Sequence, residues 1–201
     1  MNAFRALRFA AIDLWEESLV LLMVGLLGGL AALLVLPLPF VLAAHYGVAE
    51  RIPEHRVIGW RVWFRCGREH ARFFYKWVLL LFVVSAVLLT SAYFYIQLGS
   101  EAATILGSIT GGILLLWWLP QPFVPALYLK QEDRRLRIAL RNATVLALRD
   151  PLSPILLWFS ALLLAIPLGY VAWPLLLLLL VWLALVSTRA VWLHLKRPRT
   201  Q

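Results

Sequence analysis

The chain has 201 residues, of which 63% are hydrophobic and 14% are charged, and its formal net charge at pH 7 is +9. Soluble domains are roughly half apolar and a quarter charged, so this composition excludes an ordinary water-soluble domain. Because only helices and closed barrels satisfy the backbone inside a bilayer, the long apolar runs predict an all-α, polytopic integral membrane protein.

Residues 1–17 are expected to form a short interfacial helix, because apolar side chains recur there at helical spacing. A cleavable signal peptide is the competing interpretation, since Arg5 and Arg8 precede an apolar run. That run is about twice the roughly 7 to 15 residues of a signal-peptide core, which favours a retained membrane helix.

Five transmembrane crossings are predicted, each near the roughly 20 residues that span a bilayer. Their approximate ranges are 18–38, 77–97, 102–119, 152–168 and 174–193. Pro167, Gly169 and Pro174 mark the break between the last two, which share one charge-free run. The chain is expected to form a single membrane domain. It comprises repeat 1 over 18–97, repeat 2 over 102–168, a final helix, and a basic tail at 194–201.

A block of sequence occurs twice, each time at the end of an apolar run. Each copy has a Gly-Gly pair followed, after six residues, by the proline motif. The copies are Gly28-Gly29 with Leu36-Pro37-Leu38-Pro39-Phe40-Val41-Leu42-Ala43, and Gly111-Gly112 with Leu119-Pro120-Gln121-Pro122-Phe123-Val124-Pro125-Ala126. The prolines must stop or bend each helix. Turns at the membrane surface are the favoured interpretation, and the alternative is that the two breaks approach each other around a central site. The glycine pairs are expected to pack the first crossing against the third.

The basic residues predict an orientation. Two of the 19 precede the first crossing, and the others lie in 51–76, 130–149 and 189–199. Five crossings put these three segments on one side, which their charge marks as cytoplasmic. The N-terminus would then be outside, the C-terminus inside, and the two helical repeats parallel. A cytoplasmic N-terminus is the alternative, if the first run re-enters at the Pro37 and Pro39 break.

Two of the predicted cytoplasmic segments carry a cationic stripe along a helix. The first stripe is Arg61, Arg65, Arg68, Arg72 and Lys76, and the second is Arg134, Arg137 and Arg141. Such stripes are typical of helices at the headgroup level, so contact with anionic lipids is favoured. Docking of a partner protein is the second interpretation, and binding of an anionic substrate or nucleic acid is the third. The basic charge alone does not indicate nucleic acid, because membrane orientation also produces it.

No catalytic, cofactor or metal site is expected. The predicted crossings contain no ionisable residue except Arg189 near an end, which disfavours ion-coupled transport through a buried carboxylate. Cys66 beside Glu69 and His70 resembles a nucleophile and base, but it lacks a third, orienting group. The histidines lack the spacing and partners of metal ligands: His45, His55, His70 and His194.

Several short motifs follow one another in a recognisable order. They are Leu36-Pro37, Phe40-Val41-Leu42-Ala43-Ala44-His45-Tyr46, Trp63-Phe64-Arg65, Arg141-Asn142-Ala143, Leu146-Ala147 and Asp150-Pro151. In these motifs the chain resembles the YesL-like family of bacterial integral membrane proteins, over most of its length. The resemblance implies a multi-pass protein of the bacterial inner membrane, often encoded near carbohydrate-uptake systems and accessory to a transporter. It implies no catalytic residues.

The leading hypothesis is therefore a non-enzymatic accessory or scaffold subunit of a membrane complex. Its expected partners are membrane lipids and a membrane protein or a second copy, with no nucleic acid. The alternative is a small transporter or facilitator with a path between the two repeats. An enzyme is the third hypothesis, and it would need His45, His70 and Cys66 to converge.

Overall fold

The computed structural model describes residues 2–16, 37–52, 59–171 and 178–195, and the regular structure in these ranges is helical. The helices are α1 (Asn2–Glu16), α3 (Leu38–Arg51), α4 (Trp60–Gln97), α5 (Glu101–Trp118), α6 (Phe123–Lys130), α7 (Leu136–Arg149), α8 (Leu152–Val171) and α9 (Leu178–Leu195). The predicted all-α class is confirmed for these ranges. The first predicted crossing, 18–38, lies almost entirely outside the described residues.

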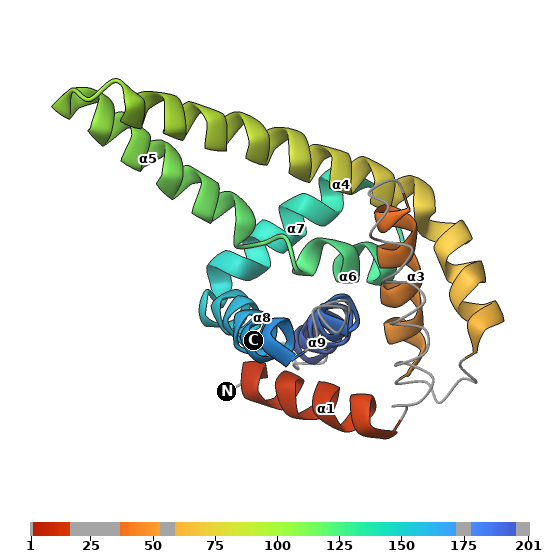
Figure 1. Ribbon diagram of the computed structural model, residues 1–201. Coiled ribbons are helices and arrows are strands. Elements are labelled where there is room, and N and C mark those ends of the chain that lie inside the picture. Colours follow the sequence, from red (N-terminus) through yellow and green to blue (C-terminus); the bar gives the residue numbers. More distant parts are fainter. Residues whose placement is uncertain (1, 17–36, 53–58, 172–177, 196–201) are drawn as a thin grey trace, which may run out of the picture.

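Helices α4 and α5 form a long hairpin that projects away from the other helices (Figure 1). Its turn is tight because Gly99 adopts a φ of 68°. Ser100 then caps α5 by accepting a hydrogen bond from the backbone N–H of Ala103 at 3.3 Å. Large apolar side chains are exposed along both helices: Leu79, Phe82, Val87, Leu89, Phe94, Ile105, Ile109, Leu115 and Leu116. A continuous apolar surface of this kind suits hydrocarbon and not water.

The described residues contain fewer candidate membrane helices than the five crossings predicted for the whole chain, the first of which lies almost entirely outside them. The segments Trp60–Gln97 and Glu101–Lys130 are long and apolar enough to cross a membrane. A third candidate is reached if α7 and α8 count as one bent span, and α9 is apolar but shorter. Figure 1 shows α8 and α9 nearly end-on, whereas α4 and α5 are seen from the side. The described part of the chain therefore contains two or three candidate spans. Helices α8 and α9 are steeply inclined to α4 and α5 (Figure 1).

The two halves share an order of elements but differ in shape. In the first half the basic segment and the second crossing form one continuous helix, α4, of 38 residues. In the second half the corresponding helices, α7 and α8, meet at a bend of 96°. Pro151 and Pro154 lie at that corner, whereas α4 contains no proline, so the helix can continue only in the first half.

The most buried part of the molecule lies where α3, α6 and α9 meet (Figure 1). The residues of α6 from Phe123 to Leu129 are all buried, and α3 is buried over most of its surface. On α9, Leu185 and Val191 are among the fully buried side chains. Both α3 and α6 begin directly after a proline break. The duplicated block therefore places its second part in the interior of the fold.

Helix α1 packs against α9 and α8. Its residue Ala6 lines a small cavity together with Ser153 at the start of α8 and Ala190 near the end of α9. The guanidinium of Arg189 also lies 6.0 Å from the centre of the Phe9 ring. These contacts put α1 beside the last described turns of the chain.

Candidate functional site at the proline breaks

The first break leads straight into α3. Pro37 precedes this helix, and its carbonyl accepts the first helical hydrogen bond from the N–H of Val41 at 3.0 Å. Pro39 is buried in the first turn. Phe40 lies against α4, with its ring centre 5.8 Å from that of Trp63. The first break therefore directs α3 onto the basic part of α4.

The second break is a tight turn that leaves two carbonyls without their usual helical donors. The N–H of Gln121 bonds to the Trp118 carbonyl at 3.3 Å and not to the Trp117 carbonyl, one residue earlier. Pro122 has no N–H to offer to Trp118, and Pro120 cannot continue the helix either. A carbonyl left unpaired in apolar surroundings costs several kcal/mol, so the Trp117 carbonyl needs another donor, whereas the Trp118 carbonyl keeps the N–H of Gln121.

Side chains supply the missing donors. Gln121 donates from Nε2 to the Trp117 carbonyl at 2.9 Å. The indole N–H of Trp158, on α8, donates to the Trp118 carbonyl at 3.1 Å. Gln121 is itself held by the indole N–H of Trp77, on α4, which donates to its Oε1 at 3.0 Å. Two distant helices thus satisfy and fix the break.

Tyr46 of α3, seven residues after Pro39, contacts the second break. Its hydroxyl donates to the carbonyl of Pro122 at 3.5 Å and accepts a hydrogen bond from Ser187 of α9 at 3.1 Å. Burial raises the pKa of Tyr46 to about 12, so its phenol keeps the proton that it donates. Helix α3, which follows the first break, therefore contacts the second break.

A cavity of about 70 Å³ lies at this meeting point. Its lining residues come from the second break and from five helices: Leu42, Tyr46, Trp77, Leu81, Trp118, Gln121, Pro122, Trp158 and Leu183. Of the predicted break residues, only Pro122 lines it. Four of its nine lining residues are aromatic side chains that lie outside the glycine pairs and proline motifs of the duplicated block: Tyr46, Trp77, Trp118 and Trp158.

The predicted packing of the glycine pairs remains a prediction. A Cβ built at Gly111 or Gly112 meets no described atom within 4 Å. Gly28 and Gly29, with the crossing that should pack on them, lie outside the described residues.

Close helix contacts occur instead at single glycines. A Cβ on Gly47 of α3 would lie 2.7 Å from the Cβ of Cys66, and a Cβ on Gly67 of α4 would lie 2.6 Å from the ring of Phe40. Gly107 similarly lets α5 approach Ile96 of α4. The sequence carries no pair or repeat to mark these glycines, so pattern reasoning missed them.

The first cationic stripe forms an exposed row on α4. Its members are Arg61, Arg65, Arg68, Arg72 and Lys76. The Arg61 guanidinium lies 5.6 Å from the ring centre of Trp60, which is itself 67% exposed. Just beyond Lys76 the surface of the same helix becomes apolar. One continuous helix therefore presents a cationic surface and then an apolar surface along its length.

The second stripe is only partly available to a partner. Arg137 and Arg141 are exposed on α7. Arg134 precedes the helix and lies 3.8 Å from a carboxylate oxygen of Glu69, which Arg51 also approaches at 4.0 Å. Exposed ion pairs of this kind contribute roughly 0 to 1 kcal/mol, so they orient the segment more than they stabilise it.

The residues of the enzyme hypothesis lie in one region but do not form a catalytic arrangement. His45 and His70 are both buried, and each has one ring nitrogen without a partner. Burial lowers the pKa of His45 to about 4, so this ring is neutral and its Nδ1 can accept the 3.4 Å hydrogen bond from Trp63. Cys66 and His70 face Gly47 of α3. Within the described ranges, no group of three His, Cys, Asp or Glu residues could hold a metal ion.

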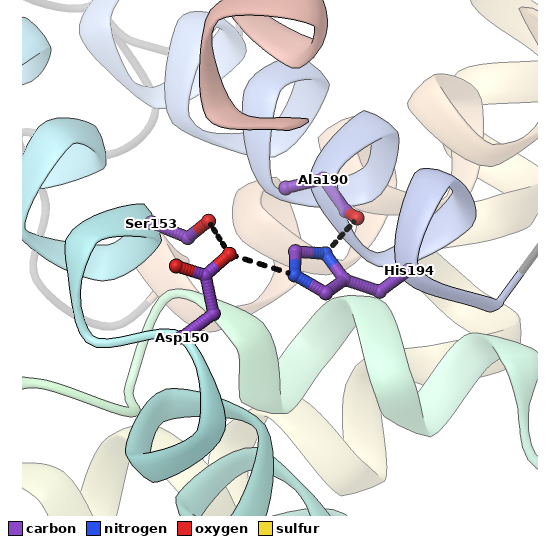
Figure 2. Close-up of polar contacts among 4 residues, drawn as sticks. All are labelled: Asp150, Ser153, Ala190 and His194. Carbon is purple, nitrogen blue, oxygen red and sulfur yellow. Dashed lines mark hydrogen bonds and ion pairs between the residues drawn. The ribbon is translucent and has the colours of Figure 1, made fainter. Parts of the chain in front are cut away.

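A polar cluster that sequence reasoning did not find joins the α7–α8 corner to the end of α9 (Figure 2). Oδ2 of Asp150 accepts a hydrogen bond from Ser153 at 2.8 Å and lies 3.1 Å from Nε2 of His194. Nδ1 of His194 lies 2.8 Å from the carbonyl of Ala190. The serine contacts the carboxylate and not the imidazole, so no base activates its hydroxyl. The cluster is a structural clamp.

The polar groups described above satisfy a broken backbone and join helix ends, while the exposed surfaces of α4 are cationic and then apolar along its length. With two or three helices able to cross a bilayer, the fold indicates a helical membrane protein. No protein-family model, curated protein or solved structure matches the chain.

Proposed function

We propose that the protein is a non-enzymatic accessory or scaffold subunit of a membrane complex, in the cytoplasmic membrane of a bacterium. The surface of α4 carries this proposal, because an exposed cationic row passes along one helix into an exposed apolar surface. Such a helix can anchor in lipid and present charge at the headgroup level at the same time. The resemblance to the YesL-like family supports an accessory role beside a transporter.

In this proposal the hairpin of α4 and α5 lies in the bilayer, and the row from Arg61 to Lys76 contacts anionic headgroups on the cytoplasmic side. The exposed face of α8, with Phe159, Leu162 and Ile166, is the candidate contact for a partner membrane helix. Because α1 packs beside the end of α9, we place both on the cytoplasmic side.

Mild extraction from native membranes tests the accessory role. A tagged chain should co-purify in an assembly larger than its own mass of 22.9 kDa with bound detergent. A photo-reactive residue in place of Leu162 should form a protein adduct, whereas one in place of Leu89 on the hairpin should react mainly with lipid. Recovery of a lone monomer with no adduct at Leu162 would refute the proposal.

A small transporter or facilitator is the second candidate, and the contact between Tyr46 of α3 and the second break motivates it. Cysteines replacing Pro37, Pro120 and Pro122, each in a Cys66→Ser background, would report a water-filled path by reacting with a polar thiol reagent. Uniform protection of these positions would exclude transport through this region.

A further inference from the structure

The lining of the aromatic cavity presents no free indole N–H group to a ligand. The indole N–H groups of its tryptophans all point to protein acceptors: Trp77 donates to Gln121, Trp158 to the Trp118 carbonyl, and Trp118 to the hydroxyl of Ser85 at 3.1 Å. Only ring faces, ring edges and aliphatic groups remain to meet an occupant.

The other polar groups of the lining are also engaged. Tyr46 is bonded to Ser187 and Pro122, and the Gln121 amide to Trp77 and the Trp117 carbonyl. An ordered water needs about two to four polar partners, and a polar ligand needs free donors or acceptors. The lining therefore disfavours both water and a hydrogen-bonding substrate.

The volume of the cavity further restricts the kind of ligand that it can hold. The cavity volume of about 70 Å³ is roughly half of the engineered cavity, near 150 Å³, that holds a benzene ring. A ring-shaped ligand is too large, whereas a short stretch of an unbranched hydrocarbon chain is narrow enough.

The position of the cavity indicates that such a chain would come from the surrounding lipid. Leu81 and Trp158 line the cavity and are half-buried, and the residues that follow them, Phe82 and Phe159, are 71% and 59% exposed. The cavity thus lies just beneath the apolar outer surface of α4 and α8. Lys76, the last residue of the cationic row, precedes Leu81 on α4 by little more than one helical turn.

We infer that this cavity binds a segment of a phospholipid acyl chain whose headgroup lies at the cationic row. The inference rests on the membrane location proposed above. An acyl chain fills the void with dispersion contacts and needs no hydrogen bond, which is what the lining offers. The bound lipid would fill the space beside the second proline break, where Tyr46 of α3 contacts Pro122.

Native mass spectrometry of the detergent-purified protein tests this inference. The probes are phosphatidylglycerol and phosphatidylcholine with identical acyl chains. Leu81→Phe fills the cavity, and Leu79→Phe makes the same change on the exposed surface of the same helix. We expect wild type and Leu79→Phe to retain one phospholipid of either headgroup, and Leu81→Phe to bind it about tenfold more weakly, which corresponds to roughly 1.4 kcal/mol.

Equal retention by Leu81→Phe and wild type would overturn the inference, as would failure of wild type to retain either lipid. Retention of phosphatidylcholine alone would also overturn it, because the occupant would then be the trimethylammonium group on the ring faces. If Leu81→Phe unfolds at a lower temperature than Leu79→Phe, Leu42→Phe fills the cavity from α3 and takes its place. Resistance of the protein to alkaline extraction from membranes separately tests the membrane location.

Discussion

The carboxylate of Asp150 lies 3.1 Å from Nε2 of His194, although the two residues are 44 positions apart. Asp150 stands at the corner between α7 and α8, and His194 in the last turn of α9. Both ring nitrogens of the histidine face acceptors, since Nδ1 lies 2.8 Å from the Ala190 carbonyl. The pair therefore joins the bent corner between α7 and α8 to the last turn of α9.

This clamp should make stability depend on pH in the acid range. Burial alone would raise the pKa of Asp150, but hydrogen bonds from Ser153 and His194 hold it below the ordinary value of 3.8. A carboxyl group with a lowered folded pKa contributes stability above its unfolded pKa and loses it as the pH falls. Wild type should exceed Asp150→Asn in thermal stability at pH 7, and the gap should close below about pH 4.

Asp133→Asn, on the exposed segment before α7, is the matched control and should follow wild type throughout. A gap between wild type and Asp150→Asn that stays constant from pH 7 to pH 3 would contradict the clamp.

Gly47→Ala should destabilise the contact between α3 and α4. The new Cβ would lie 2.7 Å from the Cβ of Cys66, a rigid atom next to the helix backbone. Overpacking of this kind costs about 1 to 3 kcal/mol, measured as a lower unfolding temperature in detergent. Gly59→Ala is the control, because its Cβ meets no described atom within 4 Å. Equal stability of the two variants would show that the helices can move apart freely.

Gln121→Leu should weaken the second proline break. It leaves the Trp117 carbonyl and the Trp77 indole N–H without their partners, at about 1 to 3 kcal/mol for each buried group. Gln131→Leu makes the same replacement where the amide has no hydrogen-bond partner, and it should be neutral or slightly stabilising. Denaturation monitored by tryptophan fluorescence compares them. Similar losses in both variants would refute the proposed support of the break.

Replacing Arg65, Arg68 and Arg72 by Gln should weaken contact with anionic lipid. Each basic residue near an anionic surface contributes about 1 kcal/mol, so together they account for roughly a hundredfold in affinity. The measurement is the rise in unfolding temperature as phosphatidylglycerol is added to the detergent-solubilised protein. Arg135→Gln is the control, since Arg135 already pairs with Asp133 at 3.0 Å. An unchanged lipid response in the triple variant would argue for a protein partner at this row.

Thiol labelling tests the side of the membrane on which α1 lies. Arg8→Cys and Leu195→Cys, both at exposed positions, are made in a Cys66→Ser background. A membrane-impermeant maleimide should label both introduced cysteines in vesicles of one orientation. It should label neither cysteine in vesicles of the opposite orientation, because α1 packs beside the end of α9. Labelling on opposite sides would restore the orientation predicted from charge, with the N-terminus outside.

Much of the local structure could be predicted from the sequence. Apolar runs predicted the end of α4 and both ends of α5 to within about a residue, but not the start of α4 at Trp60. The prolines predicted where each half breaks, because both signals act within a few residues. Whether the breaks lie at a surface or together could not be predicted, since Tyr46 and Pro122 are 76 positions apart. The bend at Pro151 was visible as a proline, but its angle depends on what packs around it.

By itself, the sequence determined the class of this protein: the free-energy cost of unpaired backbone groups in lipid forces apolar runs of this length to become helices. It also determined where those helices must end, since proline sterics are local. Only the tertiary structure decided that single glycines such as Gly47 set the helix spacing, and that Trp158 and Gln121 satisfy the broken backbone. The reason is physical: hydrogen bonds and close contacts between distant segments exist only after the chain has packed.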